Sequence, residues 1–199
     1  MLLRLSLLAF SVLAAAGQQA AHQPVLSVGM GDATRDKPQS KLWYAQGSWW
    51  AWLPAQGGSD VWRRTDSGWR RETGLAEALR GLPGQADVWA DGDTVRAVLV
   101  EPKRLAVLGL VFDGGLGRYR PAGRAIVFDM PESGGPGLET ATITRDGLGR
   151  WWIAYAWRRQ MWVRASADSA GKVWTQPIAI SREPASDDDI CTITTLPGS

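Results

Sequence analysis

The sequence predicts an all-β protein built from repeated four-stranded antiparallel units, and three observations support this. Apolar runs are separated by short glycine turns, at Gln46-Gly47, Asp91-Gly92 and Asp146-Gly147. Each of these turns leads into a second apolar run, centred on Ala51, Ala97 or Ala154. A polar turn followed by an aromatic residue recurs at intervals of about 50 residues, ending in Trp69, Tyr119 and Trp174. Glycine turns between β-rich runs indicate hairpins, so each unit is expected to be a meander.

The repeat divides the chain into three complete units and the beginning of a fourth. The units are expected over residues 39–80, 81–130 and 131–185, with an incomplete one over 186–199. The incomplete unit contributes the start of a single strand, because Asp189–Ile193 matches Glu139–Ile143 of the third unit. Four-stranded antiparallel units of this period are typical of the blades of a β-propeller. The sequence therefore predicts a partial β-propeller.

A propeller closes its ring with about four to eight blades, so three blades and one strand leave two open faces. We expect the chain to be a fragment of a longer protein, because repeat arrays need capped terminal repeats. The alternative is self-association through the open blade edges, since exposed edges and apolar faces invite pairing.

The first residues have the composition of a secretory signal. Arg4 precedes the apolar run Leu5–Ala16, which ends in the small residues that a signal peptidase requires. The run is shorter than the roughly 20 residues needed to span a bilayer. The sequence therefore predicts a signal peptide over 1–16, an N-terminal segment over 17–38 leading into the first blade, and export to the periplasm or the exterior with no stable membrane span.

Composition excludes several kinds of site. Cys191 is the only cysteine and His22 the only histidine of the 199 residues, so an internal disulfide and a His/Cys zinc site are excluded. The net charge is only +2, and the basic clusters Arg63-Arg64 and Arg70-Arg71 are too short to indicate a nucleic-acid partner. No glycine-rich nucleotide motif follows an expected strand. We expect no cofactor and no metal.

Twelve tryptophans stand against three phenylalanines and three tyrosines. Both faces of a propeller blade pack against neighbouring blades, so packing is expected to account for most of the indole rings. Stacking on sugar rings is the alternative for any one of them, because exposed tryptophan marks binding surfaces.

One aspartate turn carries a specific pattern. The stretch ASADSAGKVWTQP, residues 165–177, resembles the Asp-box of sialidase-type propellers, whose pattern is Ser-x-Asp-x-Gly-x-x-Trp. The matching residues are Ser166, Asp168, Gly171 and Trp174, with one residue inserted after Asp168. Residues 65–69 form a shortened version, and residues 112–119 a looser one. The resemblance covers about 42–199 and implies that the box is structural, with its aspartate bonded to the turn and its tryptophan plugging the blade.

The resemblance also implies glycan-directed chemistry at the mouth where the first strands of the blades begin. The catalytic candidates are Asp87, Glu139 and Asp188, because neighbouring carboxylates raise one another's pKa and paired carboxylates hydrolyse glycosides. The candidates for substrate binding are Arg35, Lys37, Lys41, Gln85, Asp187 and Asp189. The Arg-Ile-Pro motif of the family is absent, and Arg35 is the nearest arginine. The alternative is that these charged stretches are solvated loops.

Three hypotheses for function follow. The first is an exported sialidase-like propeller that acts on glycans as a glycoside hydrolase. The second is a non-catalytic propeller that binds a glycan or a protein in the cell envelope, since a fold does not fix a function. The third is a divergent fragment without a folded product.

Overall fold

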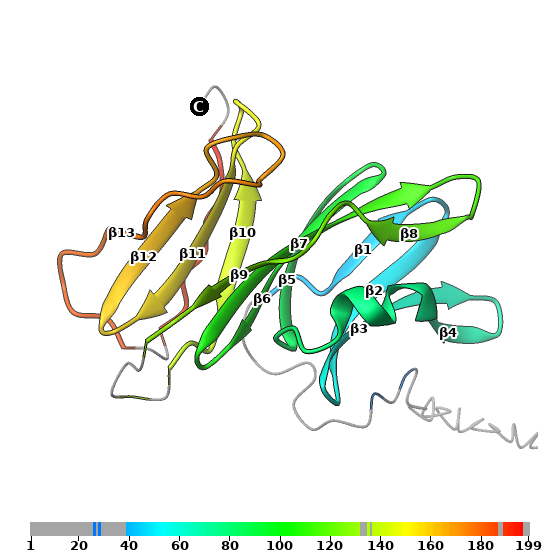
Figure 1. Ribbon diagram of the computed structural model, residues 1–199, viewed down its shortest axis with the longest axis horizontal. Coiled ribbons are helices and arrows are strands. Elements are labelled where there is room, and N and C mark those ends of the chain that lie inside the picture. The colour runs from blue at the N-terminus through cyan, green and yellow to red at the C-terminus, as the bar shows by residue number, and fades with distance from the viewer. Residues whose placement is uncertain are drawn as a thin grey trace, which may run out of the picture.

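The computed structural model describes residues 26, 28, 39–131, 135, 137–186 and 189–196. The predictions of a signal peptide over 1–16 and of binding or catalytic roles for Arg35, Lys37, Asp187 and Asp188 lie outside the described residues, as does nearly all of the N-terminal segment 17–38. The described chain is all-β apart from two short helical turns, and its strands form three antiparallel sheets that follow one another in chain order (Figure 1). The predicted fold class is confirmed.

Each sheet is a meander, which we call blades one, two and three. Blade one contains β1 (Leu42–Ala45), β2 (Ser48–Ala55), β3 (Gly58–Thr65) and β4 (Gly68–Arg71). Blade two contains β5 (Gln85–Asp91), β6 (Thr94–Glu101), β7 (Arg104–Asp113) and β8 (Arg118–Pro121), and β9 (Ile126–Asp129) also pairs with β7. Blade three contains β10 (Ala141–Arg145), β11 (Trp151–Trp157), β12 (Gln160–Ala165) and β13 (Ile178–Ala179).

The glycine turns lie where the sequence predicts them. Gln46 and Gly47 have φ values of 53° and 70°, the doubly left-handed geometry whose twist matches that of a tight hairpin. The turn between β11 and β12 achieves the same geometry without glycine, because Arg158 and Arg159 have φ values of 49° and 60°. The second strand of each blade is centred on the predicted alanine.

Two hydrophobic clusters lie between the blades. The first joins blade one to blade two and includes Trp43, Trp50 and Trp52. The second joins blade two to blade three and includes Trp151 and Tyr155. Packing between blades therefore accounts for these buried aromatic rings, as the sequence predicts.

The link between blades one and two was not predicted. It contains a 3-10 turn, η1 (Thr73–Leu75), followed by the four-residue helix α1 (Ala76–Leu79). Leu75 and Leu79 are buried in the first cluster, so the link closes one end of the interface between these two blades. No helix in the described part of the chain is long and apolar enough to cross a bilayer.

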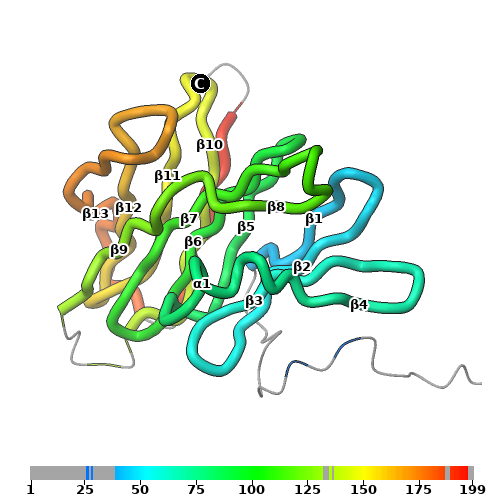
Figure 2. The backbone as a smooth tube through the Cα atoms, turned by 45° about the vertical axis from the view of Figure 1, so that its right-hand side comes forward, coloured from blue at the N-terminus to red at the C-terminus, as the bar shows by residue number. Residues whose placement is uncertain are grey.

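Residues 189–196 lie beside β10, as the red segment of Figure 2 shows. The Thr142 hydroxyl donates a hydrogen bond to the carbonyl oxygen of Cys191 over 2.9 Å. In a propeller, the first strand of a fourth blade would lie beside the first strand of blade three. Residues 189–196 lie there but do not pair as a strand.

Candidate functional site

The starts of the first strands converge on one carboxylate, that of Asp87 in β5. Its Oδ1 accepts a hydrogen bond from the Ser40 amide at 2.6 Å, and its Oδ2 accepts one from the Ile143 amide at 2.8 Å. Ser40 precedes blade one and Ile143 belongs to β10, so a single side chain connects blade two to both of its neighbours. Asp87 is only 6% exposed.

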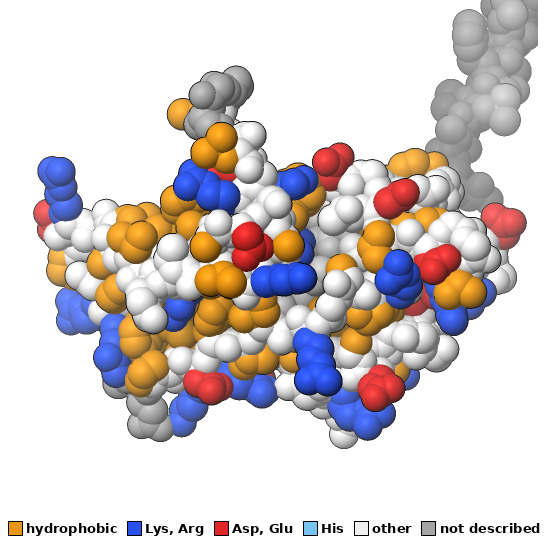
Figure 3. Space-filling model, turned by 45° about the horizontal axis from the view of Figure 1, so that its top comes forward, with side chains coloured by type: hydrophobic (Ala, Val, Ile, Leu, Met, Phe, Trp, Pro, Cys, Tyr) orange, Lys and Arg blue, Asp and Glu red, His pale blue; other side chains and the backbone are white. Residues whose placement is uncertain are grey.

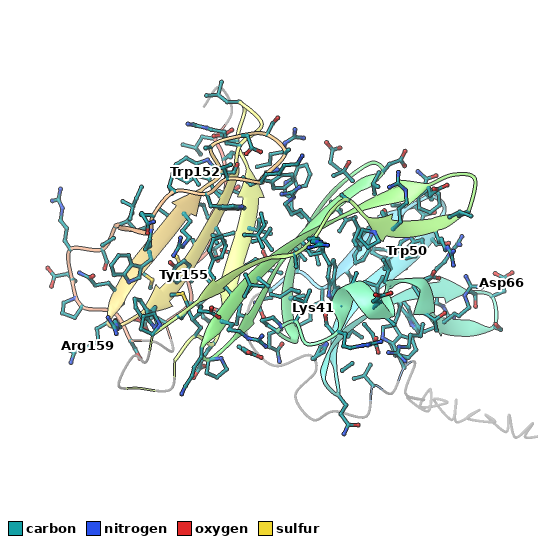
Figure 4. All side chains as sticks on the ribbon, viewed as in Figure 1. Lys41, Trp50, Asp66, Trp152, Tyr155 and Arg159 are labelled. Carbon is teal, nitrogen blue, oxygen red and sulfur yellow. The ribbon has the colours of Figure 1, made fainter. Side chains whose placement is uncertain are left out.

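Lys41 and Gln39 complete this arrangement, which we call the inner cluster (Gln39, Ser40, Lys41 and Asp87). The Lys41 ammonium donates to Gln39 Oε1 at 3.1 Å and to the Ala86 carbonyl at 3.2 Å. The Gln39 amide donates to the Ala141 carbonyl at 3.2 Å. The segment that precedes blade one therefore bonds directly to blades two and three. Lys41 lies between the right-hand and central sheets in Figure 4.

Burial shifts the titration of both charged groups in the inner cluster. It raises the pKa of Asp87 to about 6, although the Ile143 and Ser40 amides and the Lys41 charge act in the opposite direction. Burial also lowers the pKa of Lys41 to about 8, against the attraction of Asp87. Shifted pKa values of this kind occur in catalytic sites and in structural networks alike. Here both Asp87 oxygens are occupied by amides, which favours a connecting role.

The other predicted residues are placed separately. Gln85 begins β5 and Glu139 lies in the loop before β10, both half-buried. Asp189 accepts a hydrogen bond from the Ser186 amide at 2.7 Å, within its own loop. The structure thus brings together Lys41 and Asp87 from the predicted set. Among the described residues, no group of three or more His, Cys, Asp or Glu side chains is placed to hold a metal ion.

The Asp-box residues form a closed turn between β12 and β13. The two Asp168 oxygens accept hydrogen bonds from the Lys172 and Val173 amides at 3.1 and 3.0 Å. These backbone donors hold the pKa of Asp168 below its usual value. The Trp174 indole donates to the Gly171 carbonyl at 3.0 Å. These bonds close the turn on its own backbone.

Arg96 holds this turn from the neighbouring blade, a contact that no feature of the sequence predicted. Arg96 lies in β6 of blade two and donates to the Ala170 carbonyl at 2.8 Å. Gly171 has a φ of 63°, and a Cβ at this position would overlap the Arg96 guanidinium. Glycine is therefore required here both by backbone geometry and by the approach of Arg96.

A hollow of about 620 Å³ opens at the end of blade one formed by the β1–β2 and β3–β4 turns, and residues from both faces of the sheet line it. We call it the blade-one pocket. The lining residues include Tyr44, Trp49, Arg63, Arg64, Asp66 and Arg70. Asp66 lies at the tip of the β3–β4 hairpin, at the right of Figure 4.

Two aromatic rings give the pocket an apolar wall. Tyr44 and Trp49 are cross-strand partners in β1 and β2, with ring centroids 5.4 Å apart and planes inclined at 63°. They are 61% and 51% exposed, whereas the neighbouring Trp43 and Trp50 are buried. Strand alternation explains this difference, because successive side chains point to opposite faces of the sheet. The sequence alone did not distinguish Trp49 from the other eleven tryptophans.

Charged and apolar side chains are interspersed over the molecular surface. On the face seen in Figure 3, Lys and Arg side chains alternate with hydrophobic ones and do not form a single basic stripe. No protein-family model matches the chain, and comparison with curated proteins finds no match.

Proposed function

We propose that this chain belongs to an exported, sialidase-like β-propeller that binds glycans without cleaving them. The observation that carries the proposal is the blade-one pocket, in which two exposed aromatic rings stand beside arginine, aspartate and hydroxyl groups. Binding sites for small molecules combine an apolar wall with a few polar groups that fix orientation. Flat aromatic rings pack against the apolar C–H faces of sugars, while the polar groups meet the hydroxyls.

The distribution of carboxylates favours binding over hydrolysis. Glycoside hydrolysis requires two carboxyl groups on either side of the scissile bond. Asp66 is the only carboxylate that lines the blade-one pocket. Asp87, the most buried of the described catalytic candidates, has both oxygens engaged by backbone amides. Neither site offers two available carboxylates.

Export is part of the proposal and rests on the sequence of residues 1–16, which has the charged, apolar and small-residue regions of a signal peptide. An exported protein meets the polysaccharides of the envelope and its surroundings. The resemblance of residues 165–177 to the Asp-box points to the same class of ligand.

Calorimetric titration of the full chain with oligosaccharides tests the proposal. Trp49→Ala is expected to weaken binding at least about tenfold, because it removes the larger ring of the pair. Leu148→Ala is the matched control, since Leu148 is 74% exposed on blade three, and it should bind as the parent does. Equal affinity of the Trp49 and Leu148 variants would contradict the proposal.

A parallel assay for released reducing sugar separates binding from hydrolysis. No release is expected from any glycoside in a broad panel. Turnover that Asp87→Asn or Glu139→Gln abolishes in a folded chain would instead establish the hydrolase.

The open face of blade one favours association with another protein sheet as a second candidate. Leu42 adds a third large side chain, 55% exposed, to those of Tyr44 and Trp49. Exposed apolar faces of this kind mark interaction sites. Sedimentation of the full chain and of its Leu42→Asp variant tests this candidate: a concentration-dependent oligomer that the variant dissociates would support it, and a parent monomer would oppose it.

A further inference from the structure

The Lys41 amine is the strongest nucleophile of the inner cluster, and its hydrogen bonds orient it. Its Nζ donates to Gln39 Oε1 at 3.1 Å and to the Ala86 carbonyl at 3.2 Å. Both acceptors are uncharged. Within the described part of the chain, no carboxylate lies within ion-pair distance of Nζ. The amine is therefore held in place without a salt bridge to a described residue.

This geometry suits the neutral form of the amine. An ammonium group has three N–H donors, whereas a neutral amine has two N–H groups and a lone pair. The two acceptors take up both N–H groups, so the lone pair remains available for a new bond. Burial favours the same form, because it lowers the pKa of Lys41 from its ordinary 10.5 to about 8. Near neutral pH, the unprotonated fraction is therefore more than about a hundredfold larger than for an ordinary lysine.

Asp87 determines which kind of adduct the inner cluster can hold. Among the described residues, it is the charged group that acts on Lys41, and its oxygens already accept the Ser40 and Ile143 amides. Acylation of Lys41 would give a neutral amide and deprive this buried carboxylate of a counter-charge. A protonated Schiff base keeps the positive charge and one N–H donor. The attraction to Asp87 and one of the two hydrogen bonds therefore survive.

We propose that Lys41 binds small uncharged aldehydes covalently, as a Schiff base. The nitrogen lone pair attacks the carbonyl carbon, and the two electrons of the C=O π bond move to the oxygen, which receives a proton from the nitrogen. The resulting hydroxyl group takes a proton from solvent and leaves as water, while the nitrogen lone pair forms the C=N bond. The product keeps one N–H, and no oxidant or reductant is consumed.

The surroundings of Lys41 limit the aldehyde in size and charge. Lys41 is half-buried, so a small carbonyl compound reaches its amine more readily than a large one. An anionic aldehyde would bring its charge beside Asp87 and be repelled. None of these residues lines the blade-one pocket, so the proposal stands independently of glycan binding.

Reductive labelling of the full chain with acetaldehyde and cyanoborohydride tests the proposal, because hydride converts the Schiff base into a stable ethylamine. Peptide mass spectrometry then compares Lys41 with the exposed Lys103 and Lys172. Near neutral pH, Lys41 should be labelled at least about tenfold faster. Its rate should level off above about pH 8, whereas the rates of the exposed lysines should continue to rise. Equal rates at the three lysines would overturn the proposal.

Gln39→Glu tests whether the inner cluster is responsible. The new carboxylate would pair with Nζ and stabilise the ammonium form, so labelling of Lys41 should fall about tenfold while that of Lys103 stays unchanged. Gln160→Glu is the matched control, because Gln160 is an exposed glutamine of β12 and the change in net charge is the same. It should be labelled as the parent is. An equal fall in both variants would reflect net charge alone and would overturn the proposal.

Two further measurements test the fold and the charge of the ligand. In concentrated guanidinium chloride, Lys41, Lys103 and Lys172 should react at similar rates, because the inner cluster is lost. A preference for Lys41 that persists there would belong to the local sequence and would overturn the proposal. With glyoxylate, which carries a carboxylate, the preference for Lys41 should be several-fold smaller than with acetaldehyde. An equal preference would overturn the assignment of an uncharged ligand.

Discussion

The two interfaces between blades are built from different chemistry. Between blades one and two, large aromatic rings dominate the core: Trp50 of blade one meets Tyr119 of blade two edge to face at 4.8 Å, and Trp43 stacks on Trp50 within blade one at 6.2 Å. Two polar contacts accompany these rings: the Trp43 indole donates to the Tyr119 hydroxyl at 3.2 Å, and Arg63, which lies over Trp50, donates to the Gly117 carbonyl of blade two at 2.9 Å. This interface depends on the burial of large rings.

Between blades two and three, arginines alternate with tryptophans. Trp89 and Trp151 meet edge to face at 4.9 Å. Arg96 lies over Trp151 at 4.6 Å, and Arg145 lies over the same ring at 5.4 Å. Burial lowers the pKa of Arg96, and the neighbouring Arg145 charge adds to this effect.

The difference shows what the turn at residues 166–174 contributes to this protein. Arg96 and Arg145 place two positive charges around the Trp151 ring, and these guanidinium groups need hydrogen-bond acceptors. In the turn, the carbonyl oxygens of Ala170 and Gly171 accept hydrogen bonds from Arg96. At the first interface, Arg63 is the arginine that lies over Trp50, and it donates to the Gly117 carbonyl in the turn between β7 and β8. The two interfaces thus differ in degree: one arginine lies over the central tryptophan of the first, and two lie over that of the second.

The largest effect is expected from Trp50→Ala at the aromatic interface. The substitution removes a fully buried ring and should lower the free energy of unfolding by about 4 kcal/mol in denaturant titration. The adjacent Trp49→Ala is the control, since Trp49 is half-exposed and should cost less than about 1 kcal/mol. Equal losses at the two positions would show that burial between the blades does not dominate this interface.

A smaller loss is expected from Gly171→Ala at the arginine interface. The added methyl group meets Arg96 at a left-handed φ, so we expect a cost of about 3 kcal/mol. Combining the change with Arg96→Ala should recover part of this cost, because the overlap disappears. A double-mutant cycle with no coupling between the two positions would contradict the proposed contact.

The third effect concerns the carboxylate that connects all three blades. Burial raises the pKa of Asp87 from its ordinary 3.8 to about 6. Between pH 3.8 and about pH 6, Asp87 is protonated in the folded state and ionised in the unfolded state. The free energy of unfolding therefore falls as the pH rises through this window. Relative to Asp87→Asn, the parent should lose about 2 kcal/mol between pH 4 and pH 6.5. Unfolding free energies measured across this range should therefore diverge, and parallel profiles would refute the assignment.

The meanders were predictable because their signals are local. A turn such as Gln46-Gly47 fixes a hairpin from two residues, and the repeat then assigns the strands on each side. The turn at Asp168 was predictable for the same reason, since its carboxylate bonds within that turn. In contrast, η1 and α1 carry few local signals and are held by the burial of Leu75 and Leu79.

The candidate sites depend on contacts between distant residues, which one sequence does not reveal. The recurrence of charged residues did bring Lys41 and Asp87 into one set. It did not show that the two Asp87 oxygens would be taken up by amides from other blades. Arg64 looked like one half of a basic pair, and only strand alternation in the folded sheet separates it from Arg63.

The position of Asp87 also has a consequence for the order in which the chain folds. Each hairpin closes a loop of a few residues, which is fast, whereas the two bonds of Asp87 close sequence separations of 47 and 56 residues and are entropically slower. The carboxylate has neither amide partner until blades one and three dock on blade two. Blade two is therefore expected to serve as the template, and docking of the outer blades to limit the folding rate. During that interval both faces of the central sheet stay exposed, so the nascent chain is most vulnerable to aggregation after its strands have formed and before its blades have met.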